Sequence, residues 1–156
     1  MAFEPTKPQL ELAFHARIAV AAPRSLGRTP AGERRIIDIV GGEVSGPRLS
    51  GRILPGGADW QILRDDGTAV LEARYTIEAA DRSLVYVRNF GFRHGPPDLL
   101  MRIGRGEEVD PALYYFRGAP AFETAAPELA WLNRTVTVCS GVRTRDRVIL
   151  DFYAVK

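Results

Sequence analysis

Apolar and polar side chains alternate with a period of two along much of this chain, a pattern typical of β-strands that bury one face. Gly, Pro, Asn and Asp interrupt the alternation at short intervals and mark turns. We predict strands near residues 9–20, 34–44, 46–54, 58–64, 69–78, 83–90, 113–117, 121–124, 131–141 and 146–155. Within the longer excursion at 97–108, a short helix fits residues 98–103.

Many short strands with hardly any helix indicate an all-β fold, either a sandwich or a closed antiparallel barrel. Closure would remove exposed strand edges, but the alternation by itself leaves both architectures open. No internal repeat and no long Pro/Gly linker divides the sequence, so we expect a single domain over residues 1–156. Asp65-Asp66-Gly67 predicts a hairpin turn between two of the strands.

The two terminal strands differ in how their faces are built. In the first, the apolar side chains share one face: Leu10, Leu12, Phe14, Ala16, Ile18 and Val20. The last is apolar on both faces, with Val148, Leu150, Phe152 and Ala154 opposite Ile149, Tyr153 and Val155. Such a strand is covered on both sides, so it lies inside the sheet system or at a subunit contact. In the second case the two apolar faces serve oligomerisation, and we expect a homo-oligomer, a dimer or trimer.

Charge and composition narrow the classes of partner. Lys and Arg number 21 against 19 Asp and Glu, and the arginines are scattered among acids without a dense basic run. We therefore expect no nucleic-acid partner. No apolar run approaches the roughly 20 residues needed to cross a bilayer, and the N-terminus lacks the pattern of a secretory signal. We expect a cytoplasmic protein with no membrane partner.

The residues that usually mark cofactor chemistry are absent from the sequence in the required arrangements. His15 and His94 lack metal-ligand spacing, and one cysteine cannot build a thiolate site. No Walker loop, dinucleotide fingerprint or nucleophile elbow occurs. Cys139 lies in an apolar run and is expected to be a small buried residue. We expect neither a metal nor a cofactor.

The segment Gly56-Gly57-Ala58-Asp59-Trp60 is where we expect chemistry, if there is any. Two glycines allow the backbone to bend or to approach another chain closely. A carboxylate beside an indole in a barrel mouth would be partly desolvated, which raises its pKa and suits general acid–base catalysis. The alternative is structural, with Asp59 capping the bend and Trp60 filling the core. The residues leave both interpretations open.

Several segments from about Leu10 to Val155 form a distinctive series: Gly41-Gly42, Gly46-Pro47, Gly51, residues 54–60, Ala73-Arg74-Tyr75, Tyr115-Phe116-Arg117, Pro120, Phe122-Glu123-Thr124 and Trp131-Leu132-Asn133. In this order they resemble the DUF3237 family of unknown function, also called UPF0311. The resemblance implies a single antiparallel β-barrel of about 8–10 strands with at most one short helix. It also implies an architecture similar to allene oxide cyclase and dirigent barrels, whose apolar cavities act on hydrophobic or aromatic molecules without a metal. Where the family usually has Asp-Gly, this chain has Asp81-Arg82, which implies a different turn.

The strand at residues 69–78 offers two candidates on opposite faces, Arg74 and Tyr75. If Arg74 points into the barrel it needs a carboxylate, for which Asp59 and Glu123 are candidates. Otherwise Arg74 lies outside in a surface pair, and Tyr75 offers its phenol to a ligand. Asp59, Arg74 and Glu123 are the predicted catalytic residues.

Aromatic residues with single polar neighbours are typical of a pocket for a planar ligand, and equally of an aromatic core whose charges reach solvent. Trp131 and Asn133 are expected on one strand face, where an indole N–H and an amide would converge. The predicted substrate-binding residues are Trp60, Tyr75, Tyr115, Arg117, Trp131 and Asn133.

Two functions fit these expectations. In the first, the chain is a cofactor-independent lyase or isomerase acting on a small hydrophobic, aromatic or carbonyl-bearing molecule. Asp59 would move a proton with Glu123 as its counterpart, while Arg74, Asn133 and a tyrosine hold developing negative charge. In the second, the chain is a lipocalin-like carrier or sensor that leaves its small-molecule ligand unchanged.

Overall fold

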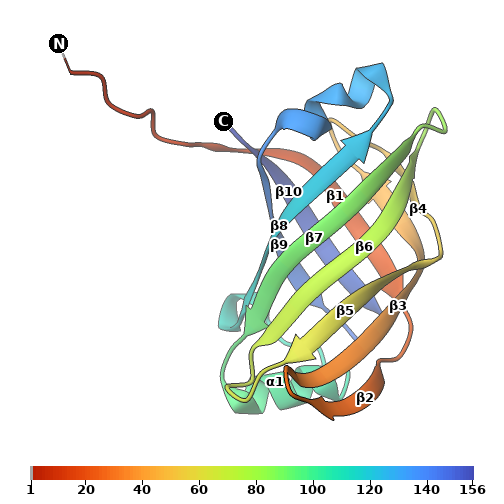
Figure 1. Ribbon diagram of the computed structural model, residues 1–156, viewed down its shortest axis with the longest axis vertical. Coiled ribbons are helices and arrows are strands. Elements are labelled where there is room, and N and C mark those ends of the chain that lie inside the picture. The colour runs from red at the N-terminus through yellow and green to blue at the C-terminus, as the bar shows by residue number, and fades with distance from the viewer. Residues whose placement is uncertain (1) are drawn as a thin grey trace.

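The predicted alternation folds into an antiparallel β-barrel in the computed structural model, which describes residues 2–156 (Figure 1). The strands are β1 (Leu10–Val20), β2 (Arg24–Thr29), β3 (Gly32–Ser45), β4 (Gly51–Ile53), β5 (Gly57–Leu63), β6 (Ala69–Ala79), β7 (Leu84–His94), β8 (Tyr115–Thr124), β9 (Thr137–Arg143) and β10 (Arg147–Val155). The helices are α1 (Pro97–Gly104) and the 3₁₀ segments η1 (Pro111–Leu113) and η2 (Pro127–Arg134).

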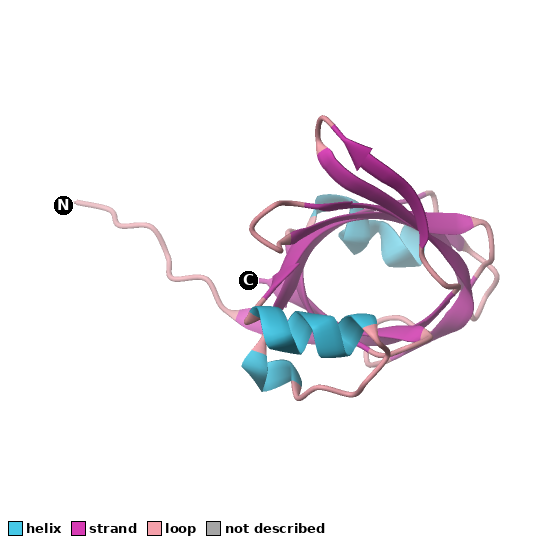
Figure 2. Cartoon of the chain, turned by 90° about the horizontal axis from the view of Figure 1, so that it is seen from below, coloured by secondary structure: helices cyan, strands magenta, loops and turns pink. Residues whose placement is uncertain are grey.

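Pairing between β1 and β3 closes the sheet. Around the barrel the strands follow the order β1-β10-β9-β8-β7-β6. The position between β6 and β3 is shared by β4 and β5, each of which pairs with both β3 and β6. The barrel therefore has eight positions in its wall. The strand β2 pairs with β3 and stands away from the wall as a flap, visible in the view along the barrel (Figure 2). The expected all-β barrel is confirmed, and closure decides against the sandwich.

Several boundaries differ from the predicted ones. The strand β2 was not predicted, because its residues are almost all exposed and lack an apolar alternation. The two strands expected at 113–117 and 121–124 are one continuous strand, β8, which begins at Tyr115 after η1. Residues 131–134, expected as strand, lie in η2, which starts at a proline and ends before the buried strand β9. The short helix expected at 98–103 is confirmed as α1.

The last strand, β10, lies inside the wall between β1 and β9, one of the two places expected for it. The hairpin between β5 and β6 turns at Gly67, which has a φ of 84°, as its sequence predicted. The turn between β6 and β7 places Arg82 at a φ of 70°, a left-handed conformation that glycine adopts more readily. No helix within residues 2–156 is long and apolar enough to cross a membrane.

The barrel interior has two halves. Towards the end where η2 lies, an aromatic cluster fills the interior: Phe14 stacks on Phe152 with ring centroids 4.5 Å apart, and Phe122 meets both rings edge-on. Towards the end where α1 lies, polar side chains project inward among aliphatic ones and line a cavity. The aromatic rings pack closely in their half, and the cavity and the wider opening that it joins lie towards the α1 end.

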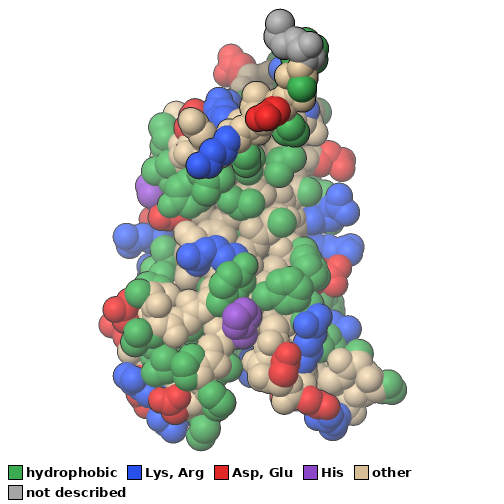
Figure 3. Space-filling model, turned by 90° about the vertical axis from the view of Figure 1, so that its left-hand side faces the viewer, with side chains coloured by type: hydrophobic (Ala, Val, Ile, Leu, Met, Phe, Trp, Pro, Cys, Tyr) green, Lys and Arg blue, Asp and Glu red, His purple; other side chains and the backbone are tan. Residues whose placement is uncertain are grey.

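The outer face of the wall is mixed in character. Figure 3 shows apolar side chains interspersed with arginines and acids on the side occupied by the later strands. On this surface Tyr115 stacks on His94, with ring centroids 4.7 Å apart, and Phe90 meets Phe92 edge-on at 5.2 Å. These aromatic pairs cover the outside of the wall and do not reach the interior.

Candidate functional site

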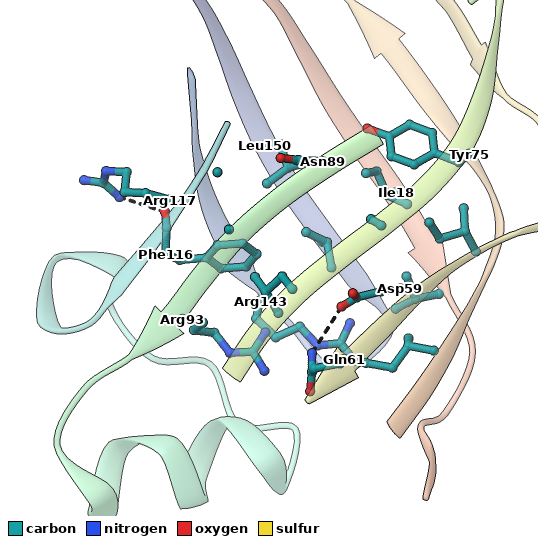
Figure 4. Close-up of a pocket in the computed structure, with 18 residues that line it drawn as sticks. Ile18, Asp59, Gln61, Tyr75, Asn89, Arg93, Phe116, Arg117, Arg143 and Leu150 are labelled. Atoms are coloured by element: carbon teal, nitrogen blue, oxygen red, sulfur yellow. Dashed lines mark hydrogen bonds between the residues drawn. The ribbon is translucent and has the colours of Figure 1, made fainter. Parts of the chain in front are cut away.

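The Gly56-Gly57 pair brings β5 against β6 and directs the next polar side chain inward. Gly56 has a φ of 111°, which turns the chain into β5. A Cβ atom at Gly57 would lie 2.4 Å from the carbonyl oxygen of Arg74 and 2.6 Å from the Cβ of Tyr75, so this close approach requires glycine. Two residues later, Asp59 projects into the hollow half of the barrel (Figure 4).

Two hydrogen bonds orient the Asp59 carboxyl. Its Oδ1 accepts from the backbone N–H of Glu72 at 2.9 Å, and its Oδ2 accepts from Gln61 Nε2 at 3.2 Å. The exposed fraction that remains faces the cavity, which Asp59 helps to line. Burial raises the pKa of this carboxyl above its usual value, although the two hydrogen bonds and the charges of Arg93 and Arg143 offset part of the rise.

Gln61 connects Asp59 to an arginine on the neighbouring strand. Gln61 is fully buried, with none of its surface exposed, and lies directly opposite Arg35 in the pairing of β5 with β3. The Arg35 guanidinium donates to Gln61 Oε1, at 3.2 Å from Nε. Because the oxygen of the Gln61 amide serves Arg35, its nitrogen is available to donate to Asp59. Burial lowers the pKa of Arg35 below its usual value.

Two further arginines face the same space, Arg93 from β7 and Arg143 from β9, each only 8% exposed. Arg143 Nη1 makes a long hydrogen bond of 3.4 Å to the carbonyl oxygen of Arg147. Arg93 lies over the ring of Phe116, with its Cζ 5.6 Å from the ring centroid. Burial, followed by the charge of Arg143, lowers the pKa of Arg93 to about 10, so it remains charged at neutral pH.

The inner end of the cavity is formed by Tyr75 and Asn89. The Tyr75 hydroxyl is buried and has no hydrogen-bond partner within residues 2–156. Burial raises the pKa of this phenol, so it stays protonated and can donate. Asn89 Nδ2 lies 3.4 Å from the sulfur of Cys139. Figure 4 shows Tyr75 and Asn89 at the end of the cavity away from α1, with Arg93 and Arg143 nearer to α1.

Aliphatic and aromatic side chains complete the wall. The cavity and its mouth together enclose about 570 Å³ of empty space, which includes open solvent. Apolar walls with few polar groups are typical of a small-molecule site. The apolar lining residues are Ile18, Val20, Ile37, Ile39, Leu71, Ala73, Phe116, Val148 and Leu150.

A wider funnel leads from solvent to this cavity, between α1, the β2 flap and the ends of the strands. The funnel and the cavity share Ile37, Arg93 and Arg143, which therefore mark the neck between them. The funnel wall also includes Leu100 and Met101 of α1. A ligand entering by this route passes the arginines before it reaches Asp59.

Of the predicted catalytic residues, the structure brings only Asp59 into the cavity. Arg74 lies on the outer face of β6 and pairs with Glu72 at 3.2 Å, which is the surface alternative considered for it. Tyr75, its neighbour, is the one that lines the cavity. Glu123 lies exposed on the outer face of β8. Arg74 and Glu123 face outward because successive side chains along a strand lie on alternate sides, so neither shares the cavity with Asp59.

The predicted binding residues, apart from Tyr75, also lie away from the interior. Trp60 is 44% exposed on the outside of β5, and Tyr115 stacks on the outer surface. Arg117 contributes to the cavity wall, but its guanidinium points away from the interior and donates to the carbonyl oxygen of Phe116 (Figure 4). The predicted aromatic pocket is therefore not formed by these side chains.

Trp131 and Asn133 do not share a strand face, because both lie in η2. The Trp131 ring packs beneath the guanidinium of Arg48, whose Cζ lies 3.6 Å from the ring centroid. The Asn133 amide accepts from the backbone N–H of Thr124 at 2.8 Å and donates to its carbonyl oxygen at 2.9 Å. Asn133 therefore fastens η2 to the end of β8, which satisfies the amide structurally.

The sequence-based prediction missed Arg35, Gln61, Asn89, Arg93 and Arg143. One signal for them exists in the alternation: Arg35 shares a face with Ile37 and Ile39, and Arg93 shares one with Val85 and Val87. A charged residue on the apolar face of a strand is costly unless it is paired or binds a ligand. Applied to every strand, that rule would have selected these arginines.

Cys139 is buried, as its sequence context predicted, beside the inner end of the cavity. Burial raises the pKa of its thiol to about 11, so the thiolate is scarce at neutral pH. The arrangement thus offers one carboxyl suited to proton transfer, three cationic hydrogen-bond donors, one unpartnered phenol and an apolar wall.

Comparisons with known proteins agree with this fold. Residues 8–155 match a family described as a protein of unknown function, DUF3237. A UPF0311 protein of Rhodopseudomonas palustris is 48% identical over 131 residues, which span 84% of this chain and 86% of that protein.

Among solved structures, a conserved protein of unknown function from Rhodopseudomonas palustris superposes with a TM-score of 0.92 at 43% identity, covering 99% of this chain and 100% of that one. An enzyme from Penicillium herquei superposes with a TM-score of 0.73 at 19% identity and covers 100% of both chains. At that identity the similarity concerns the fold.

Proposed function

Since this chain belongs to the DUF3237 family, whose name leaves its activity open, we propose an activity from the cavity itself. The chain is a cofactor-independent lyase or isomerase that moves a proton on a small hydrophobic, aromatic or carbonyl-bearing molecule. The observation that carries this proposal is the Asp59 carboxyl, which faces an apolar cavity with its pKa raised by burial.

A raised pKa suits Asp59 to both halves of a proton transfer. A carboxyl whose pKa lies nearer to neutrality is a stronger base when ionised and returns the proton readily afterwards. The backbone N–H of Glu72 and the amide of Gln61 hold the two oxygens in place, and each oxygen keeps a free lone pair. Asp59 is therefore both oriented and available to a substrate.

The proposed step begins with a C–H bond next to a carbonyl, or an O–H bond of a phenol. Asp59 accepts the proton, and the electron pair moves onto the carbonyl or phenol oxygen. The charge that develops there is stabilised by the guanidinium of Arg93 or Arg143, or by the phenol of Tyr75, in a cavity with largely apolar walls. Return of the proton at another atom gives isomerisation, and loss of a β-substituent gives elimination. Neither outcome needs an oxidant or reductant.

Deuterium incorporation tests this proposal even though the substrate is unidentified. The protein is incubated in D₂O with a panel of aromatic ketones, aldehydes and phenols, and mass spectrometry follows exchange and product formation. We expect wild type to catalyse exchange or conversion of at least one class, and Asp59→Asn to lose this activity while keeping its fold. Loss of folding in Asp59→Asn would instead assign this residue a structural role.

The matched control is Asp151→Asn, which removes a carboxyl from the outside of β10, where it pairs with His15 at 2.6 Å. We expect this variant to exchange at the rate of wild type. If wild type binds members of the panel but exchanges and converts none, the proposal fails and the chain is a carrier. The apolar wall favours that second function.

A further inference from the structure

The cavity holds an imbalance of buried charge. Arg93 and Arg143 line the cavity together with a single lining carboxyl, Asp59, whereas Arg35 lines the funnel along with Glu33 and connects to Asp59 through Gln61. Even with Asp59 ionised, the side chains that face into the cavity carry an excess of positive charge. Buried charge of one sign is costly unless an opposite charge accompanies it.

Among these arginines, Arg93 is the one whose guanidinium has no hydrogen-bond partner within residues 2–156. Arg35 is satisfied in part by Gln61, and Arg143 in part by the carbonyl oxygen of Arg147. Arg93 is 8% exposed, and its guanidinium makes no hydrogen bond to any residue in the described range 2–156 and lies over the face of the Phe116 ring. It projects into the cavity (Figure 4). Five N–H donors are therefore presented to whatever enters.

The location of these arginines suits an anion arriving from solvent. Arg93 and Arg143 line both the cavity and the funnel, so they flank the passage between them. The funnel adds Arg64 and Arg145, while Arg28 and Arg105 there are already paired with Asp65 and Glu107. A cleft lined mainly by one sign of charge concentrates ligands of the opposite sign.

The inner end of the cavity suits a neutral polar group of the ligand and not a charged one. The Tyr75 hydroxyl is buried without a partner within residues 2–156, and the guanidinium of Arg117, the charged lining residue labelled at this end in Figure 4, points out of the cavity. Between the two ends the wall is apolar. A ligand that satisfies the whole cavity has an anionic group at one end, an apolar body and a neutral oxygen at the other.

We propose that the molecule bound in this cavity is a hydrophobic monocarboxylate, whose carboxylate is held by Arg93 and Arg143 and whose far end offers a hydroxyl or carbonyl oxygen to Tyr75. Arginine binds carboxylates through paired N–H donors in one plane. A single negative charge is favoured over a phosphate, because Asp59 lies beside the arginines and repels a second charge. This inference rests on the proposed function for the identity of the site, since the carboxylate would fix the substrate beside Asp59.

Binding measurements with matched acids and amides test the inference. Isothermal titration calorimetry compares benzoate, 4-hydroxybenzoate, 3-phenylpropanoate and 3-(4-hydroxyphenyl)propanoate with their primary amides, which have the same shape without the charge. We expect at least one acid to bind wild type about tenfold or more tightly than its amide, the advantage of a charge-assisted pair. We expect the hydroxylated acid to bind more tightly than its unsubstituted counterpart, and Tyr75→Phe to remove that difference.

Variants of Arg93 and Arg74 test whether the acids bind inside the cavity. Arg93→Gln should lose the preference for acid over amide, and Arg93→Lys should retain part of it, which separates loss of charge from loss of fold. The control Arg74→Gln removes an arginine from the outer face of β6 and should bind like wild type. Equal binding of acids and amides to wild type, no binding of any acid, or an unchanged preference in Arg93→Gln would each overturn the proposal.

The two proposals fail in different ways. Acids that bind through Arg93 but undergo no exchange in D₂O would support anion binding and contradict the proton-transfer activity. Exchange on neutral compounds that depends on Asp59, with no preference for acids, would support the proton-transfer activity and contradict anion binding.

Discussion

Gln61 Nε2 donates a hydrogen bond to Asp59 Oδ2 over 3.2 Å, in a site where Gln61 is completely buried. The orientation of the Gln61 amide is set from its other side by Arg35, which donates to Oε1. Asp59 therefore receives its donor from a side chain that cannot rotate without breaking the hydrogen bond to the half-buried Arg35.

Replacing Gln61 by methionine should affect both stability and the protonation of Asp59. We expect a loss of about 1–3 kcal/mol in the free energy of unfolding, because Arg35 and Asp59 each lose a buried partner. The Gln61 hydrogen bond lowers the pKa of Asp59, so its loss should move the rising limb of the exchange rate to higher pH. Urea unfolding and a pH profile of deuterium exchange measure the two effects. The exposed Gln9→Met is the control, and an unchanged profile in Gln61→Met would contradict a role in positioning Asp59.

The raised pKa of Asp59 predicts how stability depends on pH. As the pH falls, the folded protein takes up this proton before the unfolded chain does. The stabilisation from Asp59 is thus fully present below the ordinary carboxyl pKa of about 4 and is lost as the pH rises through the higher folded-state pKa. The unfolding free energy of wild type minus that of Asp59→Asn should therefore decrease from acid to neutral pH. Urea titrations of both proteins across this range measure the difference, and an increase would show that the folded-state pKa is lowered.

Two buried tyrosines should respond in opposite directions to loss of the hydroxyl. Tyr75→Phe removes a polar group that has no partner, so we expect a gain of up to about 1 kcal/mol in the free energy of unfolding. In Tyr114→Phe, the backbone N–H of Arg143 loses the hydroxyl that accepts from it at 3.1 Å, so we expect a loss of about 1 kcal/mol. Denaturant unfolding of both variants gives the comparison. Destabilisation of Tyr75→Phe would show that its hydroxyl already has a partner.

Gly118 keeps the inner end of the cavity open. A Cβ atom there would lie 2.5 Å from Asn89 Oδ1 and 2.8 Å from Cys139 Sγ, so Gly118→Ala must displace one of these side chains. We expect a loss of about 1–3 kcal/mol in the free energy of unfolding, as for other overpacked interiors. The control is Gly104→Ala on α1, where a Cβ atom meets nothing within 4 Å and stability should not fall. Equal stability of the two variants would contradict this packing argument.

The chain's own alternation of apolar and polar residues determined most of the strands and the all-β class. A strand can be predicted locally because its period of two depends on neighbouring residues alone. The 3₁₀ segment η2 and the flap β2 were not predicted, because their structure depends on contacts with other elements and not on a local alternation of residues. Asn133, which η2 contributes, is satisfied by the end of β8 rather than by a ligand.

The tertiary structure decided which face of each strand became the interior. On β6, Arg74 and Tyr75 were equivalent candidates in the sequence, and closure of the barrel turned Tyr75 inward and Arg74 into a surface pair. Closure also gathered Arg35, Arg93 and Arg143 from β3, β7 and β9, strands far apart in the chain. Asp59 was identifiable from its own segment, but its partners were not. Their proximity follows from the circular order of the strands, which no local pattern of residues encodes.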